Sequence, residues 1–302
     1  MSHITVVGVG RIGLPVCVRL LRAGHAVTAV DLSPERTAAA VRAGASATGG
    51  GSSPAEGEAD LVLTVLPGGP ELRALMLGEE DGTGGLLDTL PATTTWIDLT
   101  SAGPALAEEL HAAADARGVE YLDAPIGGGV SAAVDGTLTF FVGGPEPALR
   151  RWEPVLQTLA QEDRILHMGP SGTGYLAKLL VNLLWFGQAV ATGEAMLLAQ
   201  AGGLDLHRFR QAVLGSAADT AFVQASLPAL FDGDYLTSFG IDRVVEELES
   251  LRTAAAGHNL PFALSGLVTD IHAQALSRFG PADGELLGVA ELEAQAGRKI
   301  RP

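Results

Sequence analysis

Lys178 is the residue whose surroundings most clearly favour proton chemistry. The 302-residue sequence contains 19 lysines and arginines, and only Lys178 and Lys299 are lysine. Lys178 lies in the apolar segment LAKLLVNLLWFG, whereas Lys299 lies in the polar C-terminal tail. Apolar surroundings disfavour the charged form of an amine, so a lysine there can exchange a proton near neutral pH, which an arginine cannot do. The structural alternative is a lysine whose stem packs while its amine reaches water.

Asn182 follows Lys178 by four residues, which places both side chains on one face of a helix. The pair comes soon after the glycine-rich segment 169–174, where the sequence pattern changes. We expect a cleft between two domains here, in which the amine transfers a proton to or from a substrate oxygen and the amide orients that oxygen. A hydrogen bond between packed helices is the alternative role for Asn182.

A glycine motif near the N-terminus predicts a phosphate-binding turn. Gly8-Val9-Gly10-Arg11-Ile12-Gly13 follows a predicted strand and opens a predicted helix. Gly8 permits the tight turn, Gly10 lets the backbone approach a pyrophosphate, and Gly13 lets helix and strand pack closely. The helix N-terminus supplies oriented amides and partial positive charge to the phosphates. In this strand–turn–helix context the motif is typical of dinucleotide-binding domains.

Asp31 ends the second predicted strand, 18 residues after Gly13. An acidic residue at this place hydrogen-bonds the hydroxyls of the adenine ribose and repels a 2′-phosphate, which favours NAD over NADP. Arg36 lies close enough in sequence to keep NADP open. The structural alternative is that Asp31 caps the turn Asp-Leu-Ser-Pro that follows it.

The pattern of apolar residues divides the chain into two parts. Short β-branched runs alternate with helical stretches in the first half, which predicts a doubly wound parallel sheet covered on both faces. The predicted strands cover 4–7, 27–30, 61–65, 95–99, 120–122, 137–142 and 165–168, and the predicted helices cover 15–23, 34–43, 70–77 and 105–117. Later stretches have helical spacing only, at 175–201, 206–214, 221–231, 241–256, 260–276 and 283–295. We expect a Rossmann domain at 1–168 and an all-helical domain at 169–302.

Composition limits the partners and the compartment. The formal net charge of −16 disfavours nucleic acid and anionic membrane surfaces as partners. The one cysteine, Cys17, excludes an intrachain disulfide and fits a reducing compartment.

The histidines have no ligand spacing, so we expect no metal site. We see no targeting segment, and the polar residues within 176–199 favour a buried helix over a membrane span. We therefore expect a cytoplasmic, soluble protein.

Five motifs, in order, carry a resemblance to a known family. They are GVGRIGLPVCVRLL at the N-terminus, TVLPGGPEL at 64–72, DLTSAGP at 98–104, DAPIGGGVSAAVDGTLTFFVGG at 123–144 and GPSGTGYLAKLLVNLL at 169–184. Together they resemble the β-hydroxyacid dehydrogenase family, which includes 3-hydroxyisobutyrate dehydrogenase and tartronate semialdehyde reductase.

The resemblance implies an NAD(P)-dependent oxidoreductase that acts on a β-hydroxy acid or its keto or semialdehyde partner. It implies that Lys178 is the catalytic acid/base, with Asn182 beside it. It also implies that the cofactor touches Leu66, Pro67 and Ser101, and that the backbone amides of Gly127, Gly128 and Gly129 bind the substrate carboxylate. A homodimer or higher oligomer through the helical half is expected, because that half carries many apolar positions.

Two departures from the family pattern keep a second function open. The family usually has Ser-Gly-Gly where this chain has Gly127-Gly128-Gly129, so a hydroxyl donor is missing. The family also has a Lys-Asp-Leu motif in the helical domain, whereas no lysine occurs between residues 179 and 298 here. The lysine position falls on Glu246 or nearer Val244, and Arg243 could substitute for the charge. Glu246 and Glu247 alternatively form a solvated face.

Three functions therefore remain to be distinguished. The first is the hydroxy-acid dehydrogenase, and the second is an imine or ketone reductase of specialised metabolism on the same scaffold. The third is a non-catalytic nucleotide-binding module, against which the Lys178–Asn182 pair argues. Asp123 is interpreted as a strand-end turn residue and His167 as structural, rather than as catalytic groups.

Overall fold

The computed structural model describes residues 1–47, 59–78 and 84–302. The chain forms two compact units, Met1–Lys178 and Leu179–Pro302, which are described separately below. The helix α7 (Thr173–Ala201) contains the division between them. Lys178 therefore closes the first unit and Asn182 belongs to the second, although both lie on one continuous helix.

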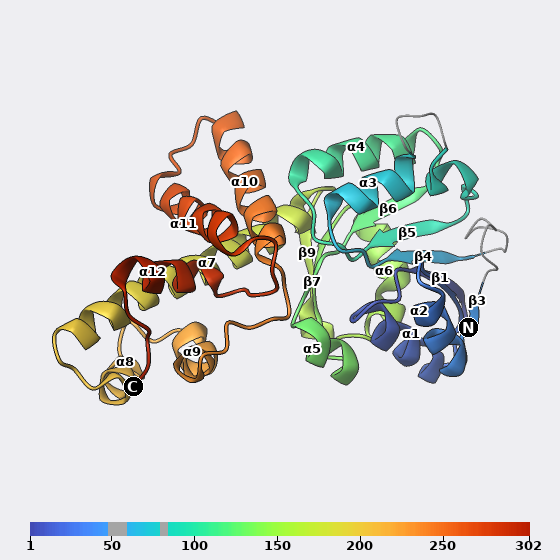
Figure 1. Cartoon of the computed structure of the whole chain (residues 1–302). Coiled ribbons are helices and arrows are strands. Elements are labelled where there is room, and N and C mark those ends of the chain that lie inside the picture. Colours follow the sequence, from blue (N-terminus) through green and yellow to red (C-terminus); the bar gives the residue numbers. More distant parts are fainter. Residues whose placement is uncertain (48–58, 79–83) are drawn as a thin grey trace. The chain divides into compact units, whose positions relative to one another are not determined.

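A nine-stranded sheet within the described residues forms the first unit (Figure 1). Its strands are β1 (His3–Val7), β2 (Ala26–Val30), β3 (Ser46–Ala47), β4 (Leu61–Thr64), β5 (Thr95–Asp98), β6 (Glu120–Asp123), β7 (Ile126–Gly127), β8 (Thr139–Gly143) and β9 (Ile165–Gly169). The order is β3-β2-β1-β4-β5-β6-β8-β7, with β9 paired to β8. This order confirms the Rossmann-type sheet.

The sheet is mostly parallel, as predicted, but two of its strands, β8 and β9, run in the opposite direction. The strands β1 to β6 pair in parallel, but β8 runs antiparallel to β6 and to β7. The β9 strand is parallel to β8. Strand direction depends on the path of the connections, which the apolar pattern of a single strand does not contain.

Helices cover both faces of the sheet (Figure 1). They are α1 (Gly13–Arg22), α2 (Pro34–Arg42), α3 (Gly69–Leu77), α4 (Pro104–Asp115), α5 (Gly129–Asp135) and α6 (Glu146–Leu156), with 3₁₀ turns η1 (Leu86–Thr89) and η2 (Glu162–Arg164). A proline in the first turn starts several of them, because it lacks only an N–H that would have no helical partner. The predicted helices include neither α5 nor α6.

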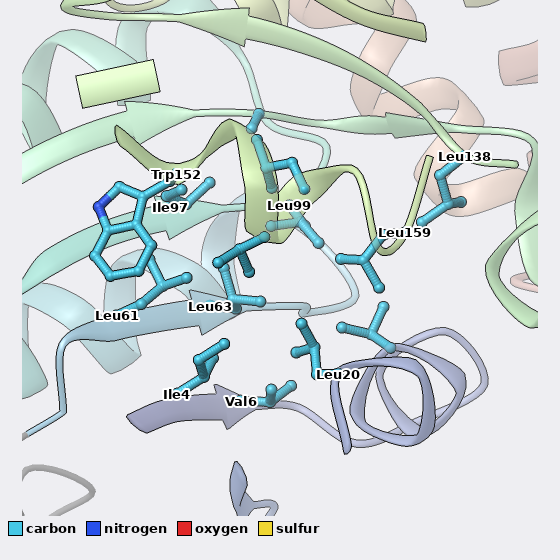
Figure 2. Packing of buried hydrophobic residues seen from close by; sticks show 14 of the residues in the cluster. Ile4, Val6, Leu20, Leu61, Leu63, Ile97, Leu99, Leu138, Trp152 and Leu159 are labelled. Atoms are coloured by element: carbon cyan, nitrogen blue, oxygen red, sulfur yellow. The ribbon is translucent and has the colours of Figure 1, made fainter. Parts of the chain in front are cut away.

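Strand residues alternate between two apolar cores, as the pleat of a strand requires. Ile4, Leu63 and Ile97 pack with α1 and α6 in the first core, which Figure 2 shows from close by. Val62 and Trp96 point to the other face and pack with α3 and α4. Burial on both faces explains why these strands have almost continuous apolar sequences.

The second unit is entirely helical, which confirms that part of the prediction. After α7 come α8 (Leu206–Val213), the π-helical turn η3 (Phe222–Ser226), α9 (Leu227–Asp232), α10 (Ile241–Gly257), α11 (Ala263–Phe279) and α12 (Leu287–Ala296). Phe222, Leu227 and Leu230 pack with residues of α7 and α12 in its core. No strand occurs between residues 179 and 302, all of which the structure describes.

Helix α7 is less buried than its sequence suggests. It is long and apolar enough to cross a membrane by length and composition, and 33% of its most apolar 18-residue window is buried. Leu180, Val181 and Leu184 are exposed on this helix. The expectation of a buried helix therefore holds only for part of its circumference.

Candidate functional site

The glycine turn after β1 has the backbone geometry of a phosphate-binding loop. Gly8 has φ 93°, and a Cβ there would lie 2.3 Å from the Val65 carbonyl oxygen. A Cβ on Gly13 would lie 1.9 Å from the Gly8 carbonyl oxygen. A Cβ on Gly10 would meet only an Arg36 Nη1 at 3.9 Å. Packing of the protein therefore requires Gly8 and Gly13, whereas Gly10 keeps the surface of the turn open for a ligand.

A hollow of about 860 Å³ opens beside this turn. Gly10, Arg11 and Asp31 line it, together with Arg36 and Arg42 from α2. Ile12 forms the N-cap of α1 and packs partly against the first core. The hollow is large enough for part of a dinucleotide, and its lining includes three arginines and two acidic residues, Asp31 and Glu35.

Asp31 connects the turn to the segment that follows β2. Its Oδ2 accepts a hydrogen bond from the Val9 amide at 2.9 Å, and its Oδ1 accepts one from the Ser33 amide at 2.8 Å. The Arg36 guanidinium lies 3.8 Å from Oδ1. Asp31 therefore does cap the turn that follows it, which was the alternative to hydrogen-bonding the adenine ribose. These two hydrogen bonds hold the carboxylate at the wall of the hollow.

The expected cofactor contacts at Leu66, Pro67 and Ser101 follow the ends of two paired strands, β4 and β5. The Leu66 amide donates to Thr100 Oγ1 at 3.2 Å, so the two loops are joined. Pro67 is exposed, and Leu66 and Ser101 are half-buried. These three residues do not line the hollow beside the glycine turn.

Asp98 is a fully buried carboxylate that is not among the predicted site residues. It accepts hydrogen bonds from Thr64 Oγ1, from Tyr175 Oη and, at 2.7 Å, from Thr100 Oγ1. Burial raises the pKa of Asp98 to about 7, although these three donors act to lower it. The available signal was an aspartate directly after Trp96-Ile97 in the buried strand Thr95–Asp98.

Asp123, at the end of β6, caps helix α7. Its carboxylate accepts the Gly172 amide at 2.7 Å and the Tyr175 amide at 3.0 Å. Burial raises the pKa of Asp123 to about 6, while the backbone amides lower it. A Cβ on Gly174 would lie 2.2 Å from the Phe141 carbonyl oxygen, so only glycine allows this close approach. Asp123 is thus more than the turn residue that the sequence suggested.

The loop of Gly127, Gly128 and Gly129 joins β7 to α5. Gly128 has φ 105° and Gly129 has φ 66°, both in the left-handed region. A Cβ on Gly128 would lie 2.5 Å from the Ala132 Cβ. At Gly127 the nearest neighbours of a Cβ would be 3.5 Å away or more, which is ordinary van der Waals contact. A side chain therefore fits at position 127, and its absence is not imposed by packing.

Lys178 and Asn182 lie one turn apart on α7, as their spacing predicted, and both are half-buried. Asn182 Nδ2 donates to Glu247 Oε2 of α10 at 2.7 Å. Glu247 is only 7% exposed, so its interpretation as part of a solvated face is wrong. The alternative role proposed for Asn182, a hydrogen bond between packed helices, is present in the structure.

Neither position aligned with the family's second lysine carries a cation. Val244 is buried in the helical unit, and Glu246 is exposed. The Arg243 guanidinium, the suggested substitute, lies 3.0 Å from Glu246 and 3.9 Å from Asp242. Its charge is thus shared with acidic neighbours on its own helix.

The other candidates have the following surroundings where they are described. The Nε2 of His167 lies 2.9 Å from the Gly144 carbonyl oxygen, a contact between chain segments beside β8 and β9. Cys17 is buried, and burial raises the pKa of its thiol to about 12. In the residues that the structure describes, no group of three or more His, Cys, Asp or Glu is placed to hold a metal ion.

The fold and the glycine turn define the class of NAD(P)-binding oxidoreductases, and comparison with known proteins narrows it. Residues 3–169 match the NAD-binding domain of 6-phosphogluconate dehydrogenase, and residues 172–288 match the NAD-binding domain of NADP-dependent 3-hydroxyisobutyrate dehydrogenase. The chain therefore belongs to the 3-hydroxyisobutyrate dehydrogenase-like, or β-hydroxyacid dehydrogenase, family of NAD(P)-dependent enzymes.

Individual relatives agree with this assignment. An NAD-dependent L-serine dehydrogenase of Pseudomonas aeruginosa is 36% identical over 68% of this chain and 66% of its own length. A probable 3-hydroxyisobutyrate dehydrogenase of Mycobacterium tuberculosis is 32% identical over 91% of this chain and 92% of its own. The structure of 3-hydroxyisobutyrate dehydrogenase from Mycobacterium tuberculosis with L-serine has a TM-score of 0.83 at 30% identity, covering 97% and 99% of the two chains.

Proposed function

We propose that this protein is an NAD(P)-linked oxidoreductase that transfers a hydride between the cofactor and a β-hydroxy acid or its keto or semialdehyde partner. The observation that carries the proposal is the Lys178–Asn182 pair on α7, in a chain whose sheet carries the open glycine turn. The bound nicotinamide would accept or supply the hydride. The substrate class is supported by the relatives, whose names include L-serine and 3-hydroxyisobutyrate dehydrogenases.

Each candidate residue has a defined role in this proposal. Lys178 Nζ takes the proton of the substrate hydroxyl during oxidation and returns it during reduction. Asn182 donates to or accepts from the same oxygen and keeps it beside the amine. The amides of the 127–129 loop bind the carboxylate, and Gly8, Gly10 and Gly13 shape the turn for the pyrophosphate.

The test is turnover of a panel of β-hydroxy acids that includes L-serine, followed by the absorbance of reduced nicotinamide. Lys178→Ala and Lys178→Arg are expected to lower kcat by about 10²- to 10⁴-fold, because neither can exchange the proton, while cofactor binding is retained. Lys299→Ala, which removes the other lysine from its ion pair with Glu293, is the matched control and keeps turnover. Full activity in Lys178→Ala would refute the proton role.

For the cofactor we propose a preference for NAD, with NADP as the rival. Asp31 supports NAD because its carboxylate lies at the wall of the hollow, where it repels a 2′-phosphate. Arg36 and Arg42 line the same hollow and favour NADP. The ratio of kcat/KM for the two cofactors decides between them. Arg36→Ala should lower the use of NADP more than that of NAD, and a preference of the wild type for NADP would overturn the proposal.

Reduction of an imine or a larger ketone is a second candidate for the same scaffold. The room beside Gly127, where the family's serine hydroxyl is missing, supports it, as does the absence of a lysine from residues 179–298. A substrate without a carboxylate would not need the serine hydroxyl. Turnover of cyclic imines, with no response to hydroxy acids, would favour this function over the first.

We further propose a cytoplasmic protein that assembles as a homodimer or higher oligomer through its helical unit. Several large apolar side chains on α7 and α11 are exposed, which supports this if they gather into one patch in the assembled protein. The net charge of −16 argues against a nucleic acid or an anionic bilayer as the alternative partner. Cell fractionation and light scattering on the purified protein test the two statements.

A further inference from the structure

We propose that Asp98, Asp123 and Tyr175 act as positioning residues that fix the first turn of α7, and with it Lys178, to the loops after β4 and β5. This inference rests on the proposed function, because it gives Lys178 a task that needs accurate placement. All of the residues belong to the unit Met1–Lys178. None of the three is assigned a reaction step.

Three chains of hydrogen bonds converge on the carboxylate of Asp98. The Leu66 amide donates to Thr100, whose hydroxyl donates to Asp98. Trp96 Nε1 donates at 2.9 Å to Thr64, whose hydroxyl donates to Asp98. In both chains the hydroxyl group donates its hydrogen toward Asp98. The direction of each chain therefore depends on Asp98 as the final acceptor.

The third chain joins this carboxylate to helix α7. Tyr121 Oη donates at 3.0 Å to Tyr175 Oη, which donates to Asp98 Oδ2. Leu66 belongs to the loop expected to touch the cofactor, and Tyr175 belongs to the helix that carries Lys178. Asp98 is thus the residue through which that loop and that helix are held together.

Tyr175 is held by two carboxylates at once. Its hydroxyl donates to Asp98, and its backbone amide donates to Asp123 at 3.0 Å. Asp98 and Asp123 are direct register partners on the parallel strands β5 and β6. Two neighbouring buried carboxylates cost stability that an apolar pair would not, so their presence indicates a purpose other than stability.

The anchored first turn of α7 determines the position of Lys178. Lys178 follows Tyr175 by three residues, about one helical turn, and helical hydrogen bonds transmit the placement of the first turn to the next. Close packing of Gly174 against the Phe141 carbonyl oxygen leaves the turn no room to shift toward the sheet. A displacement of about 1 Å at a reacting group can cost on the order of 10²-fold in rate.

The experiment compares two buried tyrosines that each lose one hydroxyl. Tyr175→Phe breaks the bond to Asp98, whereas Tyr121→Phe removes a donor further from Asp98 and leaves that bond in place. We expect Tyr175→Phe to lower kcat by about 10- to 100-fold while the dissociation constant of the cofactor changes by less than about twofold. Amide hydrogen exchange at residues 172–178 should accelerate in Tyr175→Phe and not in Tyr121→Phe.

Equal losses of kcat in the two variants would overturn the proposal, as would an unchanged kcat in Tyr175→Phe. A loss of kcat that only parallels a loss of thermal stability in both variants would do the same. If Tyr175→Phe does not fold, Asp123→Asn replaces it, since the amide keeps one acceptor oxygen for the helix cap. Retention of full kcat in Asp123→Asn would then overturn the proposal.

Failure of the proposed function gives a different result. A wild-type protein with no turnover on hydroxy acids would refute the function, and hydrogen exchange would then decide the anchoring by itself. Faster exchange at residues 172–178 in Tyr175→Phe alone would support the anchor without the chemistry. Identical exchange in the two variants would refute it.

Discussion

Position 127 shows that a single residue can depart from a family pattern without a packing reason. Gly128 must be glycine because of its φ of 105° and the nearby Ala132 Cβ, whereas Gly127 has room for a side chain. Packing therefore does not explain the missing serine. A substrate with a different head group, or one held by amides alone, would explain its loss.

Gly127→Ser is accordingly expected to fold and to raise kcat/KM for β-hydroxy acids by about tenfold, because a hydroxyl donor to a carboxylate contributes about 1.5 kcal/mol. Steady-state kinetics with the hydroxy-acid panel measures this. Gly128→Ser is the contrasting variant and should lose thermal stability. An unchanged or lower kcat/KM in Gly127→Ser would indicate that the natural substrate does not place a carboxylate at this loop.

Glu247 and Glu246 are neighbours in sequence with opposite surroundings. Glu247 is buried and accepts from Asn182, whereas Glu246 is exposed and pairs with Arg243. Glu247→Ala should lower kcat/KM by about tenfold, since Asn182 loses the acceptor that orients it. Glu246→Ala is the matched control, with an effect below about twofold. Equal effects in steady-state kinetics would refute an orienting role for Glu247.

Two buried carboxylates, Asp98 and Asp123, connect the ends of β5 and β6 to the start of α7. Burial raises the pKa of Asp98 to about 7 and that of Asp123 to about 6. An unfolded aspartate has a pKa of about 3.9. Between about pH 4 and pH 7 the folded state therefore binds more protons than the unfolded state. The contribution of these two groups to the free energy of unfolding falls as pH rises through this window and is constant above it.

We expect this contribution to fall by on the order of 4 kcal/mol between pH 5 and pH 8. Burial lowers the pKa of His272, which gives an opposite trend below pH about 6.5, so the wild type alone does not isolate the effect. Asp98→Asn removes one of the two carboxylates and should flatten the fall. Urea unfolding of both proteins at several pH values measures it, and parallel curves would contradict the assignment to Asp98.

For the whole molecule, the exposed apolar residues of the helical unit predict assembly. Leu264 is 77% exposed and Leu267 is 62% exposed, one helical turn apart on α11. The double substitution Leu264→Glu and Leu267→Glu should convert the expected dimer to a monomer, because like charges would meet in an apolar interface. Light scattering coupled to size exclusion measures the mass. Val41→Glu on α2 is the control, and a monomeric wild type would refute the prediction.

Much of the architecture could be predicted because its signals are local. The strand at 4–7 and the helix at 241–256 match the observed elements His3–Val7 and Ile241–Gly257 to within one residue at each end. Apolar periodicity and glycine punctuation operate over a few residues, so the sequence contains them directly. The two-residue strands β3 and β7 are too short to produce such a pattern.

The candidate site was predictable only in part. The turn of Gly8, Gly10 and Gly13 and the helical spacing of Lys178 and Asn182 depend on neighbours in sequence, and the structure places them as expected. The burial of Glu247 depends on how α10 packs against α7, which its charged sequence did not indicate. Charge pairs at helical spacing are usually solvated, and tertiary packing overrode that tendency here.

The sequence by itself determined most of the order of strands and helices, the glycine turn and the one lysine in an apolar helix, because each arises from contacts within a few residues. Only the tertiary structure decided the reversed direction of β8 and β9 and the meeting of Asp98, Asp123 and Tyr175. Tyr175 lies 77 residues from Asp98 and 52 from Asp123. Bonds over such separations form only when the whole sheet has assembled, and no local pattern encodes them.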